Sequence, residues 1–186
     1  MQFYDVIQSR TSIRKFKNTH INEEKLSRMI NAAMMSPTWK NNTSYRFIIV
    51  DDVDKKNKLA TAIINDTNDA ANSVREAPLV TVVVANPNLS GEVAEREYYL
   101  VDSAIALEHF VLAATAEGYG TCWIASINED DIRNILNIPK DFRVVAITPV
   151  GEIAEHKEKS TVNNAKDLVF LNSWEHSYKE KNLVMH

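Results

Sequence analysis

Three polar residues near the N-terminus, Arg10, Ser12 and Arg14, recur at every second position. In an extended chain alternate side chains share one face, so these three would line up, whereas in a helix Ser12 would point away from the arginines. Two guanidinium groups and a hydroxyl on one face form a compact anion site, because arginine presents a planar fork of donors that matches phosphate oxygens. The same pattern is also typical of a solvated edge strand.

Glycine is scarce, and this limits how a nucleotide-type cofactor can be held. The chain contains four glycines, at positions 91, 118, 120 and 151. Gly118 and Gly120 begin a G-x-G-x-x-G pattern, but position 123 is tryptophan, and no P-loop spacing with a following lysine occurs. Any such cofactor would therefore be bound mainly by side chains.

Length and composition exclude several classes of protein. The 186 residues suit one compact domain with its own core, and 21 basic against 25 acidic residues give a net charge of −4, which argues against general nucleic-acid binding. Cys122 is the only cysteine, so neither an internal disulfide nor a Cys-rich zinc site is possible. The N-terminus lacks a secretory signal, and no apolar stretch reaches the ~18–20 residues that span a bilayer. We expect a cytoplasmic protein without membrane or nucleic-acid partners.

The spacing of apolar residues predicts a mixture of helices and strands. Helices are predicted over residues 3–9, 23–35, 55–65, 66–76, 94–117 and 129–136, and strands over residues 45–50, 79–85, 121–125 and 142–150. Asn22 is the predicted N-cap of the second helix, and Gly118 the predicted stop of the longest one. The run 79–85 is almost continuously apolar, which predicts a strand buried on both faces.

The C-terminal region differs from the rest of the chain. After Gly151 the sequence becomes polar, and it then offers the apolar run 168–171 and Trp174. This stretch is too short to fold alone, so we expect an arm, over about residues 160–186, that packs on its own domain or on a partner subunit. The whole chain, 1–186, is then a single domain with this arm.

Several segments, read together, resemble the FMN-dependent nitroreductase family. The spaced residues Arg10, Ser12, Arg14 and Phe16 resemble the opening signature of that family, and residues 36–41 before the strand at position 45 resemble its second cofactor-binding loop. Residues 102–124 are similar to its long central helix and the following strand. Further matches, in order, lie at Arg133, Leu136, Ile138, Pro139, Val145 and Gly151. The resemblance covers roughly residues 2–160.

The resemblance implies a fold, a cofactor and its contacts. The fold would be α+β, with a central, mainly antiparallel β-sheet flanked by helices and a C-terminal arm extending to the partner subunit of a homodimer. FMN would lie at the subunit interface. Its phosphate would be held by Arg10 and Ser12, its pyrimidine edge would lie near Arg14, and its ring would contact a loop and main-chain donors. The implied ring contacts are Pro37, Thr38, Asn41, Ile124 and Ala125, and a basic pair, Lys157 and Lys159, would close over the phosphate.

The residues themselves leave alternatives open. Asn41 could instead cap a turn, and Lys157 and Lys159, which sit among acidic residues, could belong to a solvated loop. Trp39 could stack on the ring, face the substrate or cover the surface, and Asn72 or Arg75 are further candidate flavin contacts. Thr43 stands where the family often has glutamine, which bears on substrate preference more than on cofactor binding.

The resemblance also implies a reaction. NADH or NADPH would donate hydride to flavin N5, and a small-molecule acceptor such as a nitroaromatic or a quinone would then take the electrons, in a ping-pong sequence. No protein side chain is assigned a catalytic role and no metal site is expected, because the cofactor carries the chemistry. Two alternatives are a reductive dehalogenase-type member of the same fold, and a flavin-binding or redox-sensing protein with little turnover.

Overall fold

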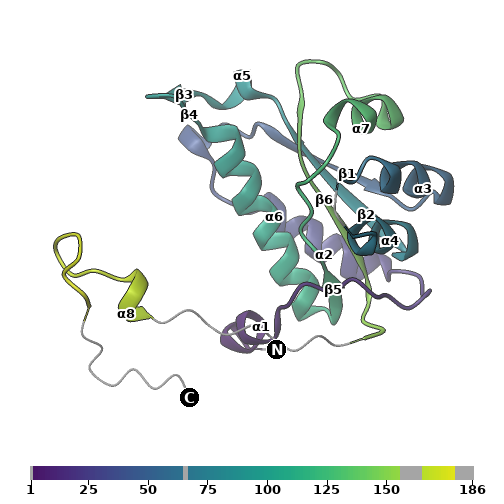
Figure 1. Cartoon of the computed structure of the whole chain (residues 1–186), viewed down its shortest axis with the longest axis horizontal. Helices are drawn as coiled ribbons and strands as arrows, with labels where there is room; N and C mark the ends of the chain where they lie inside the picture. Colours follow the sequence, from purple (N-terminus) through teal and green to yellow (C-terminus); the bar gives the residue numbers. More distant parts are fainter. Residues whose placement is uncertain (1, 65–66, 156–164, 179–186) are drawn as a thin grey trace.

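The computed structural model describes residues 2–64, 67–155 and 165–178, and its centre is a four-stranded antiparallel sheet (Figure 1). The strands lie in the order β1 (Tyr45–Val50), β2 (Leu79–Ala85), β6 (Arg143–Glu152) and β5 (Tyr119–Thr121). The two long inner strands are covered from both sides, and every residue of β2 is buried. The antiparallel sheet and the burial predicted for residues 79–85 are both confirmed.

Helices form a layer on each face of the sheet. On one face lie α2 (Glu23–Met34) and α6 (Tyr98–Ala116), whose buried side chains pack in one cluster with Val83 of β2. On the other face α3, α4 and α7 pack with Val82, because successive side chains of a strand point to opposite faces. The bounds of these three helices are Val53–Thr61, Asp69–Glu76 and Glu129–Leu136. The arrangement is the α+β fold that the sequence predicts.

The helix ends follow the local sequence. The Asn22 side chain accepts the Lys25 N–H and caps α2 as predicted, and Asp52 and Asn128 cap α3 and α7 in the same way. Gly118 follows α6 with φ of 86°, a conformation that favours glycine, and this confirms the predicted stop.

The predicted start of the longest helix was wrong. Instead of beginning near Ala94, α6 begins at Tyr98, and the preceding residues form a small hairpin of β3 (Glu92–Val93) and β4 (Arg96–Glu97). Ala94 and Glu95 adopt left-handed φ values of 52° and 63° at its turn. Both residues are good helix formers, so the helical pattern runs through them, but the turn geometry overrides that preference.

Helix α6 is, in length and apolar composition, sufficient to cross a bilayer, and it is the one such helix in the described part of the chain. Eight of its residues are buried, however, and it packs against α2 and the sheet. Its apolar character is therefore accounted for by its place in the core.

The two ends of the described chain lie beside or beyond the sheet layers. The N-terminal helix α1 (Phe3–Ser9) is adjacent to α6, while α8 (Ala165–Leu168) and the turn after it stand apart from the rest of the molecule in Figure 1. A bridge between Phe170 and Ser177 closes this turn, and Trp174 at its tip is 80% exposed. An extended arm is what the sequence predicts; its contact with a partner subunit stays a prediction.

Candidate functional site

The N-terminal motif lies in an extended chain, residues 10–17, that pairs with β5 near Ser12 and with the end of β6 near Phe16. The Ile13 N–H donates to the Thr121 carbonyl oxygen at 2.8 Å, and the Lys17 N–H donates to Glu152 at 2.9 Å. Ser12 forms a parallel bridge with Thr121. The predicted extended conformation is confirmed, and main-chain bonds at both ends fix the chain to the sheet.

Glycines in the sheet allow this close contact. A Cβ atom on Gly120 would lie 2.8 Å from side-chain atoms of Ile13, and one on Gly151 would lie 2.7 Å from Pro78 and 3.0 Å from Phe16. Ile13 and Phe16 are consequently buried against the sheet. The extended chain can press onto β5 and β6 because these two positions carry no side chain.

The polar residues of the motif remain available on the other side of the chain. Arg10, Ser12 and Arg14 are all half-buried. Neither guanidinium group has a hydrogen bond or ion pair with the residues that the structure describes. Burial raises the pKa of Glu108 in α6, and the charge of Arg10 partly opposes this shift, so Arg10 acts on one carboxylate without direct contact. Half-buried arginines that make no direct ion pair suit an external anion such as a phosphate.

A cavity of about 450 Å³ opens at the start of the motif, between α1, the C-terminal end of α6 and β5. Arg10, Lys17 and Lys25 contribute its cations and Glu117 and Glu152 its carboxylates. The hydrogen bonds from Arg28 hold the pKa of Glu117 below its ordinary value, and Lys25 donates to the Glu117 carbonyl oxygen at 2.8 Å. These charges therefore largely satisfy one another, whereas Arg10 makes no direct ion pair with the described residues and only its charge acts on Glu108.

The segment after β5 lies on the same side of the molecule. Ile124 is buried, and its N–H donates to the Ile147 oxygen at 2.9 Å, so this main-chain donor is already used within the sheet. Ala125 is exposed, and its N–H has no partner in the described part of the chain. Of the two predicted main-chain donors, Ala125 is the one positioned to bind a ligand.

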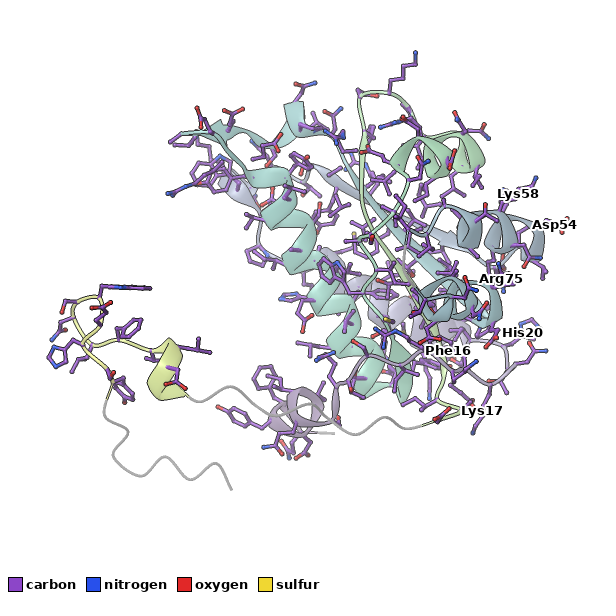
Figure 2. The ribbon with its side chains drawn as sticks, viewed as in Figure 1. Phe16, Lys17, His20, Asp54, Lys58 and Arg75 are labelled. Atoms are coloured by element: carbon purple, nitrogen blue, oxygen red, sulfur yellow. The ribbon has the colours of Figure 1, made fainter. Side chains whose placement is uncertain are left out.

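Helix α4 brings two further polar residues toward the motif. Lys15 pairs with Glu76 at 3.6 Å, which places the end of α4 beside the extended chain; Figure 2 labels Arg75 on this helix and Phe16 on the chain. Arg75 donates to the Asn72 Oδ1 atom at 2.7 Å. Their spacing of three residues puts both side chains on one side of the helix.

The second predicted cofactor-binding segment, residues 36–41, lies largely within a loop over residues 37–42, which has a different construction. It contains a 3-10 turn, η1 (Trp39–Asn41), in which Lys40 and Asn41 have left-handed φ values of 49° and 61°. Pro37 and Asn41 are exposed and Thr38 is half-buried. Asn41 is exposed in this left-handed turn, and such a conformation is several-fold commoner for asparagine than for most residues.

Trp39 is committed to packing within its own chain. Its ring stacks on Tyr98 with centroids 3.9 Å apart and an angle of 13° between the planes. Gly91 makes room on another side, since a Cβ there would lie 3.3 Å from the indole nitrogen. Of the alternatives that the sequence left open, the structure favours a packing role over a residue that faces the substrate.

The two groups of candidate residues lie at opposite ends of α6 (Figure 1). The loop is attached to the first turns of α6 through Tyr98 and Asp102, whereas the motif lies beyond its last turn, beside Thr121. At about 1.5 Å per residue, the helix from Asp102 to Ala116 alone extends about 21 Å. One FMN cannot contact both groups in a single chain.

The basic pair Lys157 and Lys159 lies outside the described residues. A residue that the sequence analysis overlooked is Asp102, a buried carboxylate in a mainly apolar helix that accepts one hydrogen bond from the loop. An acidic side chain at a position that the helical spacing buries is the signal that could have identified it.

Comparison with known proteins adds to this geometry. The model of a family described as the nitroreductase family matches residues 7–74 and 65–152. A crystal structure of a nitroreductase family protein from Clostridium novyi NT is 46% identical in sequence, covers 96% of this chain and 97% of its own, and superposes with a TM-score of 0.81.

Two more distant relatives are named for a cofactor or an activity. A structure described as an FMN-dependent nitroreductase from Clostridium difficile R20291 is 28% identical, with 91% and 98% of the two chains covered and a TM-score of 0.77. A protein of Archaeoglobus fulgidus, provisionally named an NADH dehydrogenase/NAD(P)H nitroreductase, is 26% identical over 157 residues, or 82% of this chain and 86% of that relative.

Proposed function

Because the chain belongs to the nitroreductase family, we propose that it is an FMN-dependent oxidoreductase that uses NADH or NADPH to reduce nitroaromatics, quinones or similar small acceptors. The observation that carries this proposal is the pair of half-buried guanidinium groups, Arg10 and Arg14, neither of which makes a hydrogen bond or a direct ion pair in the described chain. The names of the relatives from Clostridium difficile and Archaeoglobus fulgidus support the cofactor and the electron donor.

The protein's own residues bind and orient in this proposal. Arg10 and Ser12 hold the FMN phosphate, and the Ala125 N–H donates to the ring. Arg14 lies near the pyrimidine edge, where a cation stabilises the negative charge of the reduced form. Asn72 and Arg75 belong to α4, the end of which lies beside the extended chain, and they are further candidate contacts of the flavin. The electron chemistry between NAD(P)H and the acceptor would be supplied by bound FMN.

A homodimer would bring the two separated groups of residues together. We propose that the loop 37–42 of one subunit lies over the ring of an FMN whose phosphate is held by the motif of the other subunit. Large apolar side chains are exposed on two adjacent helices and on the separate arm, as expected of surfaces that another chain covers. They lie on α1, on α6 and on the arm: Phe3, Tyr4, Ile7, Leu100, Val101, Leu168, Leu171 and Trp174.

Two measurements test the proposed function. The purified protein should show the visible absorption of oxidised flavin, and stopped-flow mixing with NADH or NADPH should bleach it at a rate compatible with turnover. Steady-state kinetics with a quinone should give the parallel double-reciprocal lines of a ping-pong sequence. A bound flavin that NAD(P)H reduces too slowly to support turnover would instead favour the binding or sensing alternative.

The oligomeric state tests the second half of the proposal. Sedimentation should give a dimer that binds one FMN per chain. A flavin-loaded monomer would contradict the shared site, because the two groups of candidate residues cannot reach one FMN within a single chain.

A further inference from the structure

Asp102 is a buried carboxylate whose hydrogen bonds are directed to the loop 37–42 and its surroundings. It is 1% exposed, in the second turn of α6. Its Oδ1 atom accepts the Trp39 N–H at 2.7 Å, and its Oδ2 atom accepts the Ser90 hydroxyl at 2.9 Å. No cation pairs with it in residues 2–64, 67–155 and 165–178.

Stability alone does not explain a buried carboxylate at this position. Removing a carboxylate from water is costly, and well-packed apolar residues often replace buried charges without loss of stability. The carboxylate instead fixes the relative position of two segments of the chain, because each of its two oxygens accepts a hydrogen bond from a different segment. One donor belongs to the first residue of η1, and the other belongs to the segment that precedes the hairpin β3–β4.

The loop has few other attachments. The Asn42 N–H closes the turn on the Trp39 oxygen at 2.9 Å, and the Trp39 ring stacks on Tyr98. Lys40 and Asn41 between them adopt left-handed conformations, which persist only where surrounding contacts enforce them. The Trp39 N–H lies at the start of this turn, so the carboxylate fixes the point from which the turn develops.

We propose that Asp102, assisted by Ser90, is a positioning residue that holds the loop 37–42 in the conformation in which Thr38 and Asn41 contact the flavin ring. This inference rests on the proposed function, since the loop matters for catalysis only if a flavin is bound. Asp102 itself touches neither cofactor nor substrate in this proposal; it acts through the main chain of Trp39.

Variants of Asp102 in the full-length FMN-loaded protein test the inference. In Asp102→Ala the amides of residues 37–43 should lose protection in hydrogen–deuterium exchange, the spectrum of the bound flavin should shift, and the rate of flavin reduction by NADPH should fall by about 10–100-fold, as expected of a misplaced positioning group. Asp102→Asn should recover most of the rate, because the amide oxygen still accepts the Trp39 N–H and the amide nitrogen can donate to Ser90.

Two further variants separate positioning from general stability. Ser103→Ala is the matched control, since Ser103 is also buried in α6 but donates within the helix, to the Tyr99 oxygen. It should leave the exchange of residues 37–43 and the flavin spectrum unchanged. Ser90→Ala leaves the carboxylate in place, so it should cause a smaller loss of protection, and with Asp102→Asn it keeps the test open if Asp102→Ala does not fold.

The outcomes are distinct from those of the proposed function. Unchanged exchange of residues 37–43 and an unchanged flavin spectrum in Asp102→Ala would overturn the inference, and so would equal effects in Ser103→Ala. A wild-type protein that binds no flavin would overturn the proposed function instead, while the exchange experiment would still decide whether Asp102 holds the loop.

Discussion

The extended chain 10–17 and the loop 37–42 both carry candidate FMN contacts, yet they are held in different ways. The extended chain is bound to the sheet edge by main-chain hydrogen bonds and by Ile13 and Phe16, which pack over glycines. The loop is held by one carboxylate, one aromatic stack and a turn with two left-handed residues. A phosphate site can therefore be built into sheet architecture, whereas a ring contact depends on a few side chains and is easier to change.

The largest effect should come from filling the space under the extended chain. Gly120→Val would place side-chain atoms where Ile13 now lies, and overpacking of this kind costs about 1–3 kcal/mol or more of unfolding free energy. Urea unfolding measures this loss, and FMN binding should weaken with it. Gly118→Ala is the control: its Cβ would meet no atom within 4 Å, so only backbone strain of about 1 kcal/mol is expected.

Removing one cation should weaken cofactor binding without unfolding the protein. Arg10→Ala should raise the Kd for FMN about 10–100-fold, because a hydrogen bond to a charged group is worth about 1.5–3 kcal/mol. Flavin fluorescence titration measures the change. Lys17→Ala is the matched control, since Lys17 lies on the same extended chain but pairs with Glu152 at 3.7 Å. Equal effects of the two substitutions would show that only general positive charge matters.

A third variant tests the layer that supports both regions. Burial raises the pKa of Glu129, but hydrogen bonds from Arg143 and from the Val144 N–H and the charges of Arg143 and Arg133 outweigh it and hold this pKa below its ordinary value. A carboxyl with a lowered pKa in the folded state stabilises the protein above its unfolded pKa of about 4.3, and this contribution is lost as the pH falls through the folded value.

Glu129→Gln should accordingly cost about 1–2 kcal/mol at pH 7, and the difference from wild type should shrink as the pH falls below about 4. Thermal unfolding across this pH range is the measurement. The Kd for FMN at pH 7 should not change, because Glu129 ties α7 to β6 and lies in neither candidate region. A higher Kd for FMN would mean that a change in packing at α7 and β6 alters the cofactor site through the sheet.

The smallest effect is expected at Trp39. Trp39→Phe keeps an aromatic stack on Tyr98 and should change stability by less than about 0.5 kcal/mol, while Trp39→Ala should cost about 0.5–1.5 kcal/mol. Thermal unfolding compares the two. If Trp39→Phe slowed turnover strongly at unchanged stability, the indole would have to contact substrate or cofactor, against the packing role that the structure favours.

The sequence predicted well what depends on neighbours along the chain. The alternation of Arg10, Ser12 and Arg14, the cap at Asn22 and the apolar run 79–85 are local patterns, and each prediction of structure drawn from them is confirmed. The FMN contacts themselves stay predictions, and so does the arm's contact with a partner.

What the sequence could not reveal depends on contacts between distant segments. Helical periodicity could not predict the hairpin before α6, because Ala94 and Glu95 favour a helix in isolation. The role of Asp102 requires knowing that Trp39, 63 positions away, lies against the same helix. The Ile124 N–H is unavailable to a ligand because it bonds to Ile147 of β6, and the spacing of residues 121–125 does not specify that pairing.

The length of helix α6 also sets a distance within the molecule. Its 19 residues set how far apart the loop 37–42 and the extended chain 10–17 of one subunit lie. In the proposed dimer, each of these regions would have to meet the other region of the partner subunit. Deleting a single residue between Asp102 and Ala116 would shorten the helix by about 1.5 Å and rotate one end by about 100° relative to the other. If the dimer forms as proposed, a change in the length of this helix would misalign both flavin sites at once.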